Sequence, residues 1–81
     1  MDKDLQVREA ILEIVENQLN ENNPPETKLT LERLIKEGHK KSEAKKLISY
    51  CLLTELNSMM KTQRLFDNKK YAKSLAKLPR M

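Results

Sequence analysis

The sequence has one cysteine, one glycine and no tryptophan, and aromatic residues make up only 4% of its 81 residues. One cysteine cannot form an internal disulfide, so we expect Cys51 to pack as a small apolar side chain. One glycine cannot build a glycine-rich phosphate loop. A twisted β-sheet favours aromatic and β-branched side chains, and their scarcity leads us to predict an all-α fold.

Long apolar stretches are missing as well. The apolar run at residues 51–53 is among the longest in the sequence, whereas a helix that spans a bilayer needs about 20 apolar residues. The polar start at residues 1–4 does not resemble a signal peptide. We therefore expect a cytoplasmic protein with no membrane contact. A chain of this length has room for one hydrophobic core, so we predict a single helical domain over residues 1–81.

Charge is abundant but unevenly distributed. Residues 1–27 contain seven acidic and two basic side chains, a net charge of −5. Residues 28–81 contain five acidic and 14 basic side chains, a net charge of +9, which accounts for the total of +4. Such asymmetry is typical of proteins with an acidic partner, and also of two faces of one fold that attract each other.

Apolar residues at helical spacing predict the first two helices. The first covers about residues 4–20 and carries Val7, Ile11, Ile14 and Val15 on one face. The two prolines at 24 and 25 end it and suit the first turn of a second helix, which we expect Asn23 to cap and Gly38 to end. We expect these two helices to be antiparallel, with the second turning three apolar residues inward: Leu31, Leu34 and Ile35.

The second half of the chain predicts two more helices. A helix capped by Ser42 and running to about residue 61 is apolar over more than half of its circumference, so we expect the other helices to pack around it. Position 45 is a lysine, so we expect no capping box. Leu65 and Phe66 are expected to fill the core before Asp67 caps a last helix that ends near residue 78. The predicted architecture is a compact four-helix array with a central third helix.

Glu55 is the unusual residue of the third helix, because its position falls on the apolar face. A buried carboxylate there must be ion-paired, accept backbone N–H groups from the start of a neighbouring helix, or have a raised pKa. We interpret Glu55 as a structural buried acid, since no base, nucleophile or metal ligand is expected beside it. A contribution to an enzyme site assembled with another protein is the less favoured alternative.

The last helix has a basic face opposite its apolar side, and phosphate groups are the natural ligands of such a face. No aromatic residue, asparagine or glutamine interleaves this face to read bases, so a solvated surface is the simpler interpretation. Arg64 is expected to extend it. The candidate phosphate-contacting residues are Lys69, Lys70, Lys73, Lys77 and Arg80.

The chain resembles a known family at several positions of structural rather than chemical importance. They are Pro24-Pro25, Gly38, Glu55-Leu56, Phe66-Asp67 and Leu78-Pro79. It is similar to the C-terminal half of the domain-of-unknown-function family numbered 1841, a family of small bacterial proteins, over about three quarters of its length. The resemblance implies a bacterial helical domain and no activity. Longer members carry histidines near the helix matching the first one here, where this chain reads Leu5-Gln6-Val7-Arg8, so no functional residue transfers.

No catalytic or metal-binding set stands out in the sequence. His39 is the only histidine, and no second ligand lies near it along the chain. We therefore expect no enzyme activity, no cofactor and no metal. The leading hypothesis is a protein-interaction or accessory module, with an unknown protein or a second copy as its partner. Such a module should expose apolar residues on the acidic first helix or on the Leu53/Met60 side of the third. Nonspecific nucleic-acid binding is the alternative.

Overall fold

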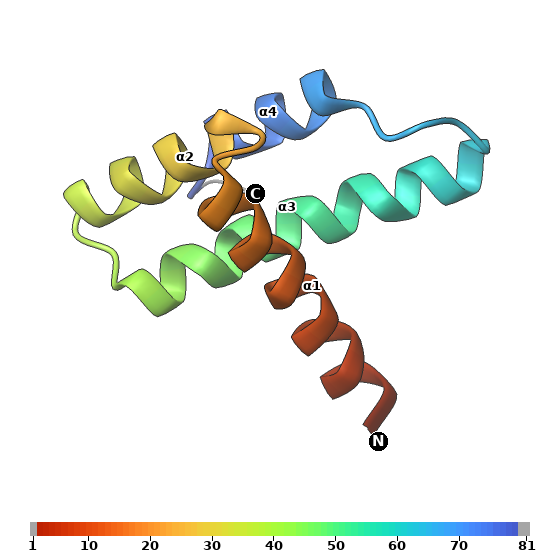
Figure 1. Ribbon diagram of the computed structural model, residues 1–81, viewed down its shortest axis with the longest axis horizontal. Coiled ribbons are helices and arrows are strands. Elements are labelled where there is room, and N and C mark those ends of the chain that lie inside the picture. Colours follow the sequence, from red (N-terminus) through yellow and green to blue (C-terminus); the bar gives the residue numbers. More distant parts are fainter. Residues whose placement is uncertain (1, 80–81) are drawn as a thin grey trace.

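The computed structural model describes residues 2–79, with side chains from residue 7 onward. It contains four helices: α1 (Asp2–Glu21), α2 (Pro25–Lys36), α3 (Lys41–Thr62) and α4 (Asn68–Lys77). The described residues form no strand, and the predicted all-α four-helix array is confirmed. Figure 1 shows α2 and α4 on the same side of α3, with α1 running across the group. Both α2 and α3 contact the other three helices, so α2 shares the central role predicted for α3.

The turn between α1 and α2 is built by two asparagines and two prolines. Asn22 has a positive φ of 51°, and the backbone N–H of Asn23 donates to the carbonyl oxygen of Gln18 at 3.0 Å. Asn23 therefore completes the end of α1, and Pro24 occupies the N-cap of α2, so the predicted cap was wrong. Figure 1 shows α2 leaving this turn across the direction of α1, and the predicted antiparallel pairing was also wrong.

Gly38 ends α2 as predicted. Its φ is 103°, a conformation that side chains with a Cβ rarely adopt. The N–H of Gly38 donates to Ile35 O and the N–H of His39 donates to Leu34 O, each at 3.0 Å. These two bonds form the Schellman arrangement, which satisfies the last carbonyl groups of the helix.

The start of α3 differs from the prediction by two residues. Lys40 occupies the N-cap, and the helix begins at Lys41 instead of after Ser42. This shift places Glu43 three residues after the cap, where its carboxylate accepts the backbone N–H of Lys40 at 3.3 Å. Half of a capping box therefore forms, because the residue at the third position is Glu43 and not Lys45.

The core lies where α1, α2 and α4 meet α3. Two apolar residues assigned to the inner face of α1 remain outside it, with Val7 47% and Ile14 39% exposed. On α2, Ile35 is 43% exposed, while Thr27 and Thr30 are buried in its place. The buried apolar residues are Ile11, Val15, Leu31, Leu34, Ala44, Ile48, Cys51, Leu52, Tyr71, Leu75 and Leu78.

A buried polar network joins three helices within this core. Gln18 of α1 accepts two hydrogen bonds at its Oε1, from Thr27 Oγ1 at 2.8 Å and from the Tyr71 hydroxyl at 2.9 Å. Thr27 and Tyr71 come from α2 and α4, and both are fully buried. Because buried hydroxyl groups without partners cost free energy, these bonds fix how the three helices meet.

The Tyr71 hydroxyl is expected to make the protein sensitive to alkali. Burial raises the pKa of Tyr71 from 10.0 to about 12. A group whose pKa is raised by folding stabilises the fold fully below its unfolded pKa, and this stabilisation is lost as the pH rises toward the folded value. Each pKa unit corresponds to about 1.4 kcal/mol, so wild type should lose about 2 kcal/mol of unfolding free energy through this residue near pH 11.5.

Tyr71→Phe isolates this effect, because the variant differs from wild type only by the phenol hydroxyl. At neutral pH the variant should be about 1 kcal/mol less stable, since one hydrogen bond to Gln18 is lost. At about pH 11.5 it should be the more stable protein, because it has no phenol to ionise. Urea denaturation at both pH values measures the difference, and an equal alkaline loss in the two proteins would contradict the buried position of the hydroxyl.

Candidate functional site

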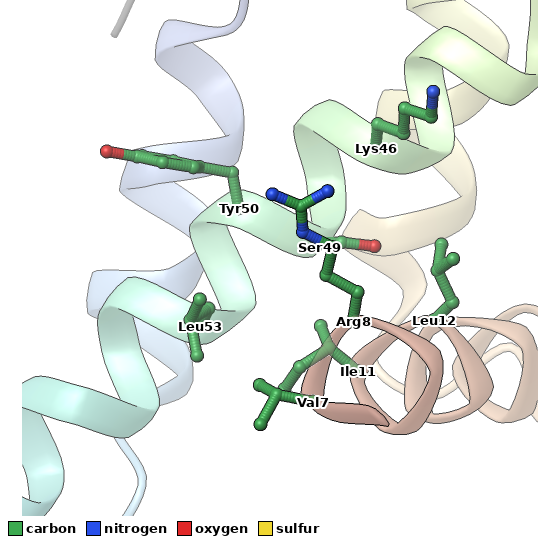
Figure 2. A pocket seen from close by; sticks show the side chains of 8 residues that line it. All are labelled: Val7, Arg8, Ile11, Leu12, Lys46, Ser49, Tyr50 and Leu53. Carbon is green, nitrogen blue, oxygen red and sulfur yellow. The ribbon is translucent and has the colours of Figure 1, made fainter. Parts of the chain in front are cut away.

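A groove lies between α1 and α3, where the two helices cross. It has a volume of about 420 Å³. Figure 2 shows the side chains of Val7 and Ile11 on α1 facing Leu53 on α3. The lining residues are Val7, Arg8, Ile11, Leu12, Lys46, Ser49, Tyr50 and Leu53. We call this feature the α1–α3 groove.

The apolar surface of the groove is open to solvent. Val7 is 47% exposed, Tyr50 is 55% exposed, and Met60 further along α3 is 71% exposed. Single exposed apolar residues are ordinary, but exposed ones that share a concave surface are typical of a binding site. The groove is therefore a candidate site for an apolar group.

The charged groups of the groove are all basic. Arg8 extends from α1 toward Ser49 and Tyr50, and Lys46 lies at the edge formed by α3 (Figure 2). Among the described residues that line the groove, none is acidic. A ligand with an apolar face and a negative charge at its side would match this arrangement.

The two helices that form the groove are joined by core contacts and by an ion pair. Ile11 and Val15 of α1 are buried against the core, and Glu16 forms an ion pair with Lys45 of α3. Ile11 therefore has a double role, because it anchors α1 and also forms the floor of the groove. These contacts fix the position of α1 against α3 at residues 11–16.

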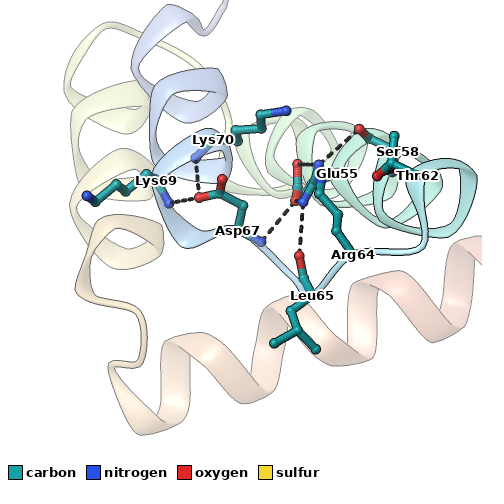
Figure 3. Close-up of polar contacts among 8 residues, drawn as sticks. All are labelled: Glu55, Ser58, Thr62, Arg64, Leu65, Asp67, Lys69 and Lys70. Atoms are coloured by element: carbon teal, nitrogen blue, oxygen red, sulfur yellow. Dashed lines mark hydrogen bonds and ion pairs between the residues drawn. The ribbon is translucent and has the colours of Figure 1, made fainter.

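Glu55 lies in a second polar cluster, in the C-terminal half of α3. Its carboxylate is 5% exposed and receives two bonds from the Arg64 guanidinium, at 2.7 Å and 3.2 Å. It also accepts the backbone N–H of Asp67 at 3.0 Å, just before α4 begins (Figure 3). Glu55 thus has two of the three arrangements that the sequence left open, an ion pair and a bond to a helix start.

The pKa of Glu55 is lowered, not raised. The hydrogen bonds from Arg64 are the largest cause and outweigh the effect of burial, which acts in the opposite direction, and the N–H of Asp67 adds to the lowering. The carboxylate is therefore ionised at neutral pH and unsuited to take up a proton. A raised pKa, the third possibility, was wrong.

The loop between α3 and α4 is fastened by the same cluster. Arg64 also donates to Leu65 O and to Ser58 Oγ, each at 3.0 Å (Figure 3). The Leu65 side chain points outward and is 88% exposed, so its predicted place in the core was wrong. Phe66 is partly buried, with its ring edge-on to Tyr71 at a centroid distance of 5.6 Å.

Asp67 caps α4 as predicted. Its Oδ1 accepts the backbone N–H groups of Lys69 at 2.9 Å and Lys70 at 3.2 Å. These two bonds, that of Lys70 first, lower the pKa of Asp67. Glu55, Arg64 and Asp67 together therefore set where α4 starts and how it leaves α3.

The basic face of α4 is exposed to solvent and consists of lysine side chains. Lys69, Lys70, Lys73 and Lys77 are all exposed to solvent, and Arg80 lies outside the described residues. Arg64 does not extend this face, because its guanidinium is bound to Glu55. The groove does not include any residue of α4, so the two features are separate surfaces.

Two groups of contacts were missed at the sequence level. Arg33 of α2 donates to Leu75 O at 3.0 Å and to Leu78 O at 2.9 Å, which caps the C-terminus of α4. Nothing in the sequence indicates this bond, because the partners are 42 and 45 residues away. The buried Thr27 and Thr30 share a helical spacing with Leu31 and Leu34, and that signal was present but not used.

Among the side chains that the structure describes, those of residues 7–79, no group of three or more His, Cys, Asp or Glu is arranged to hold a metal ion. None of the helices described combines the length and apolar character needed to cross a membrane. Burial raises the pKa of the Cys51 thiol, which disfavours the reactive thiolate.

Comparison with family models, with curated proteins and with solved structures gives no match to this chain. The resemblance to family 1841 stays a prediction. The functional argument therefore depends on the geometry and charge of the surfaces described above.

Proposed function

We propose that this chain is a non-catalytic protein-interaction module that binds an amphipathic helix bearing acidic residues in the α1–α3 groove. The observation that carries the proposal is an open apolar groove whose only charged side chains, among the described residues, are Arg8 and Lys46. The resemblance to family 1841 favours a bacterial cell as its setting, and the composition of the sequence favours the cytoplasm, in an accessory role.

A helix is the occupant that best fits the shape of the surface. Helix-in-groove recognition places apolar residues spaced three and four apart into an apolar channel, with polar residues at the rim. The exposed Met60 continues the apolar surface of α3 beyond the groove, which suits an extended ligand. Exposed apolar residues on α1 and on the Leu53/Met60 side of α3 are also what the sequence-based hypothesis requires.

The acidic character of the partner follows from the rim. Complementary charges raise the association rate and exclude partners of the wrong sign. Lys45 is already paired with Glu16, whereas Arg8 and Lys46 face the groove. Acidic residues flanking the apolar stripe of the partner would meet these two side chains.

A designed peptide tests the proposal. The peptide is an amphipathic helix of about four turns with leucines on one face and glutamates at its flanks, and its labelled form is titrated by fluorescence anisotropy. Leu53→Glu should weaken binding at least about tenfold, because it places an unpaired carboxylate in the apolar contact. Leu65→Glu is the matched control on an exposed leucine outside the groove, and should stay within about twofold of wild type.

Two charge-reversal variants test the contribution of charge to peptide binding. Lys46→Glu should weaken binding of the acidic peptide by about fivefold and strengthen binding of the same peptide with lysines in place of the glutamates. Lys77→Glu changes the net charge equally but lies on α4. Equal losses in Lys46→Glu and Lys77→Glu would show attraction to the whole basic protein and would contradict the proposal.

Nonspecific nucleic-acid binding by α4 stays a prediction. The four lysines are exposed, but the structure places no aromatic side chain among them that would stack on bases. The groove combines shape and charge, so it supports protein binding better than α4 supports nucleic-acid binding.

A further inference from the structure

The N-terminal half of α1 is itself a helix of the kind that the groove would take. Figure 1 shows it extending past α3 and away from α2 and α4. All side chains of residues 7–10 are exposed. Val7, Ala10 and Ile14 are spaced three and four apart, so they share one face, and they form an exposed apolar stripe on α1.

Two acidic side chains of α1 complement the basic groove. Glu13 borders the apolar stripe and Glu9 lies one turn before it, and both are exposed. The groove offers Arg8 and Lys46. On a larger scale, residues 1–27 carry a net charge of −5 and residues 28–81 a net charge of +9, so this segment of one molecule is attracted to the remainder of another.

Symmetry makes this contact self-consistent. A two-fold axis that places the α1 of a second copy in the groove necessarily places the first α1 in the groove of that copy. The contact is then isologous and closed, which is the commonest arrangement in homodimers. A projecting helix end of a few turns is marginal in water by itself, and packing against a second copy would stabilise it.

We infer that the partner in the groove is a second copy of this chain, which inserts residues 7–14 of its α1 and receives the same segment in return. This inference rests on the proposed function and names its partner. Val7 of the partner subunit then contacts Leu53 and Tyr50, and Glu13 of the partner subunit lies near Lys46 or Arg8.

Sedimentation velocity over a concentration series tests the dimer. The wild type should shift from monomer to dimer as its concentration rises. Val7→Glu should raise the dissociation constant at least about tenfold, because the substitution puts a carboxylate on both sides of the symmetric contact. Leu29→Glu is the control, since Leu29 is a 62% exposed leucine on α2 that does not line the groove, and it should dimerise like wild type.

Isotope-filtered NMR on a mixture of labelled and unlabelled protein tests the face that is used. Contacts between the Val7 methyl groups of one molecule and Leu53 or Tyr50 of another are expected. A dimer whose intermolecular contacts lie only on α2 or α4 would overturn the inference, as would a wild type that stays monomeric at the highest concentration reached.

The designed peptide separates this inference from the proposed function. A monomeric wild type that binds the acidic peptide in the groove would overturn self-association and leave the interaction module standing. A monomeric wild type that binds no peptide would overturn both. A dimer that the peptide dissociates would support both, because the peptide and the second copy then compete for one groove.

Discussion

Replacing Glu55 by glutamine is expected to lower the free energy of unfolding by about 2 to 3 kcal/mol. Glutamine keeps the shape of the side chain but removes the negative charge that accepts two bonds from Arg64. Breaking a buried ion pair from one side leaves the other charge without compensation. This loss is smaller than the roughly 3 to 5 kcal/mol typical of fully buried ion pairs, because Arg64 is 25% exposed and retains some contact with water.

The effect should also depend on pH in a defined direction. The pKa of Glu55 lies below its ordinary 4.5, so its stabilising contribution is present above about pH 4.5 and is lost as the pH falls through the folded value. The stability difference between wild type and Glu55→Gln should therefore shrink in acid. Chemical denaturation over a pH series measures it.

Glu32→Gln provides the matched control for this prediction. It removes the same charge from an exposed position on α2 and should change the unfolding free energy by no more than about 0.5 kcal/mol. A Glu55→Gln variant as stable as Glu32→Gln at neutral pH would show that the cluster around Arg64 does not hold α4 in place.

Leu34→Ala is expected to cost about 3 kcal/mol, the other large effect. Leu34 is fully buried on α2 at the contact with α3, and removing its side chain leaves a cavity that a small core cannot fully close. The matched control is Leu29→Ala on the same helix, where the leucine is 62% exposed and the loss should stay near the 0.5 kcal/mol expected for surface changes.

Thermal and urea denaturation of the two leucine variants tests which face of α2 is buried. Both substitutions introduce the same residue into the same helix, so helix propensity cancels in the comparison. Equal losses would mean that α2 buries a different face, and with it the assigned roles of Thr27 and Arg33 would be wrong.

Helix number, order and several end signals were predictable because they are local. Gly38 ends α2 and Asp67 caps α4 through bonds between residues two to five positions apart, which is information that the sequence carries directly. The start of α3 was misplaced because Ser42 is a good cap by type, yet Glu43 can satisfy the N–H of Lys40 if the helix begins earlier.

The faces of the helices were harder to predict because they depend on neighbours. Val7 and Ile14 fit the apolar periodicity of α1 but remain 47% and 39% exposed, so periodicity alone overestimates the core. Leu65 is apolar yet exposed, because the pairing of Arg64 with Glu55 fixes the loop with the leucine side chain outward.

The groove itself could not be located from the sequence. It exists because α1 crosses α3 instead of lying antiparallel to α2, and that crossing follows from the turn at residues 22–25 together with contacts distant in sequence. The sequence shows only two features that contribute to it. One is that α1 and α3 have more apolar residues than a single buried face needs, and the other is that an acidic segment precedes a basic one.

The most direct test of the central claim is an amide NMR titration of the wild-type protein with the acidic amphipathic peptide, run above and below the concentration at which the protein self-associates. The account predicts chemical-shift changes concentrated at residues 7–12 of α1 and 46–53 of α3, with α4 unaffected. Changes centred on Lys69, Lys70, Lys73 and Lys77, or no changes at any concentration, would contradict the assignment of the α1–α3 groove as the binding surface.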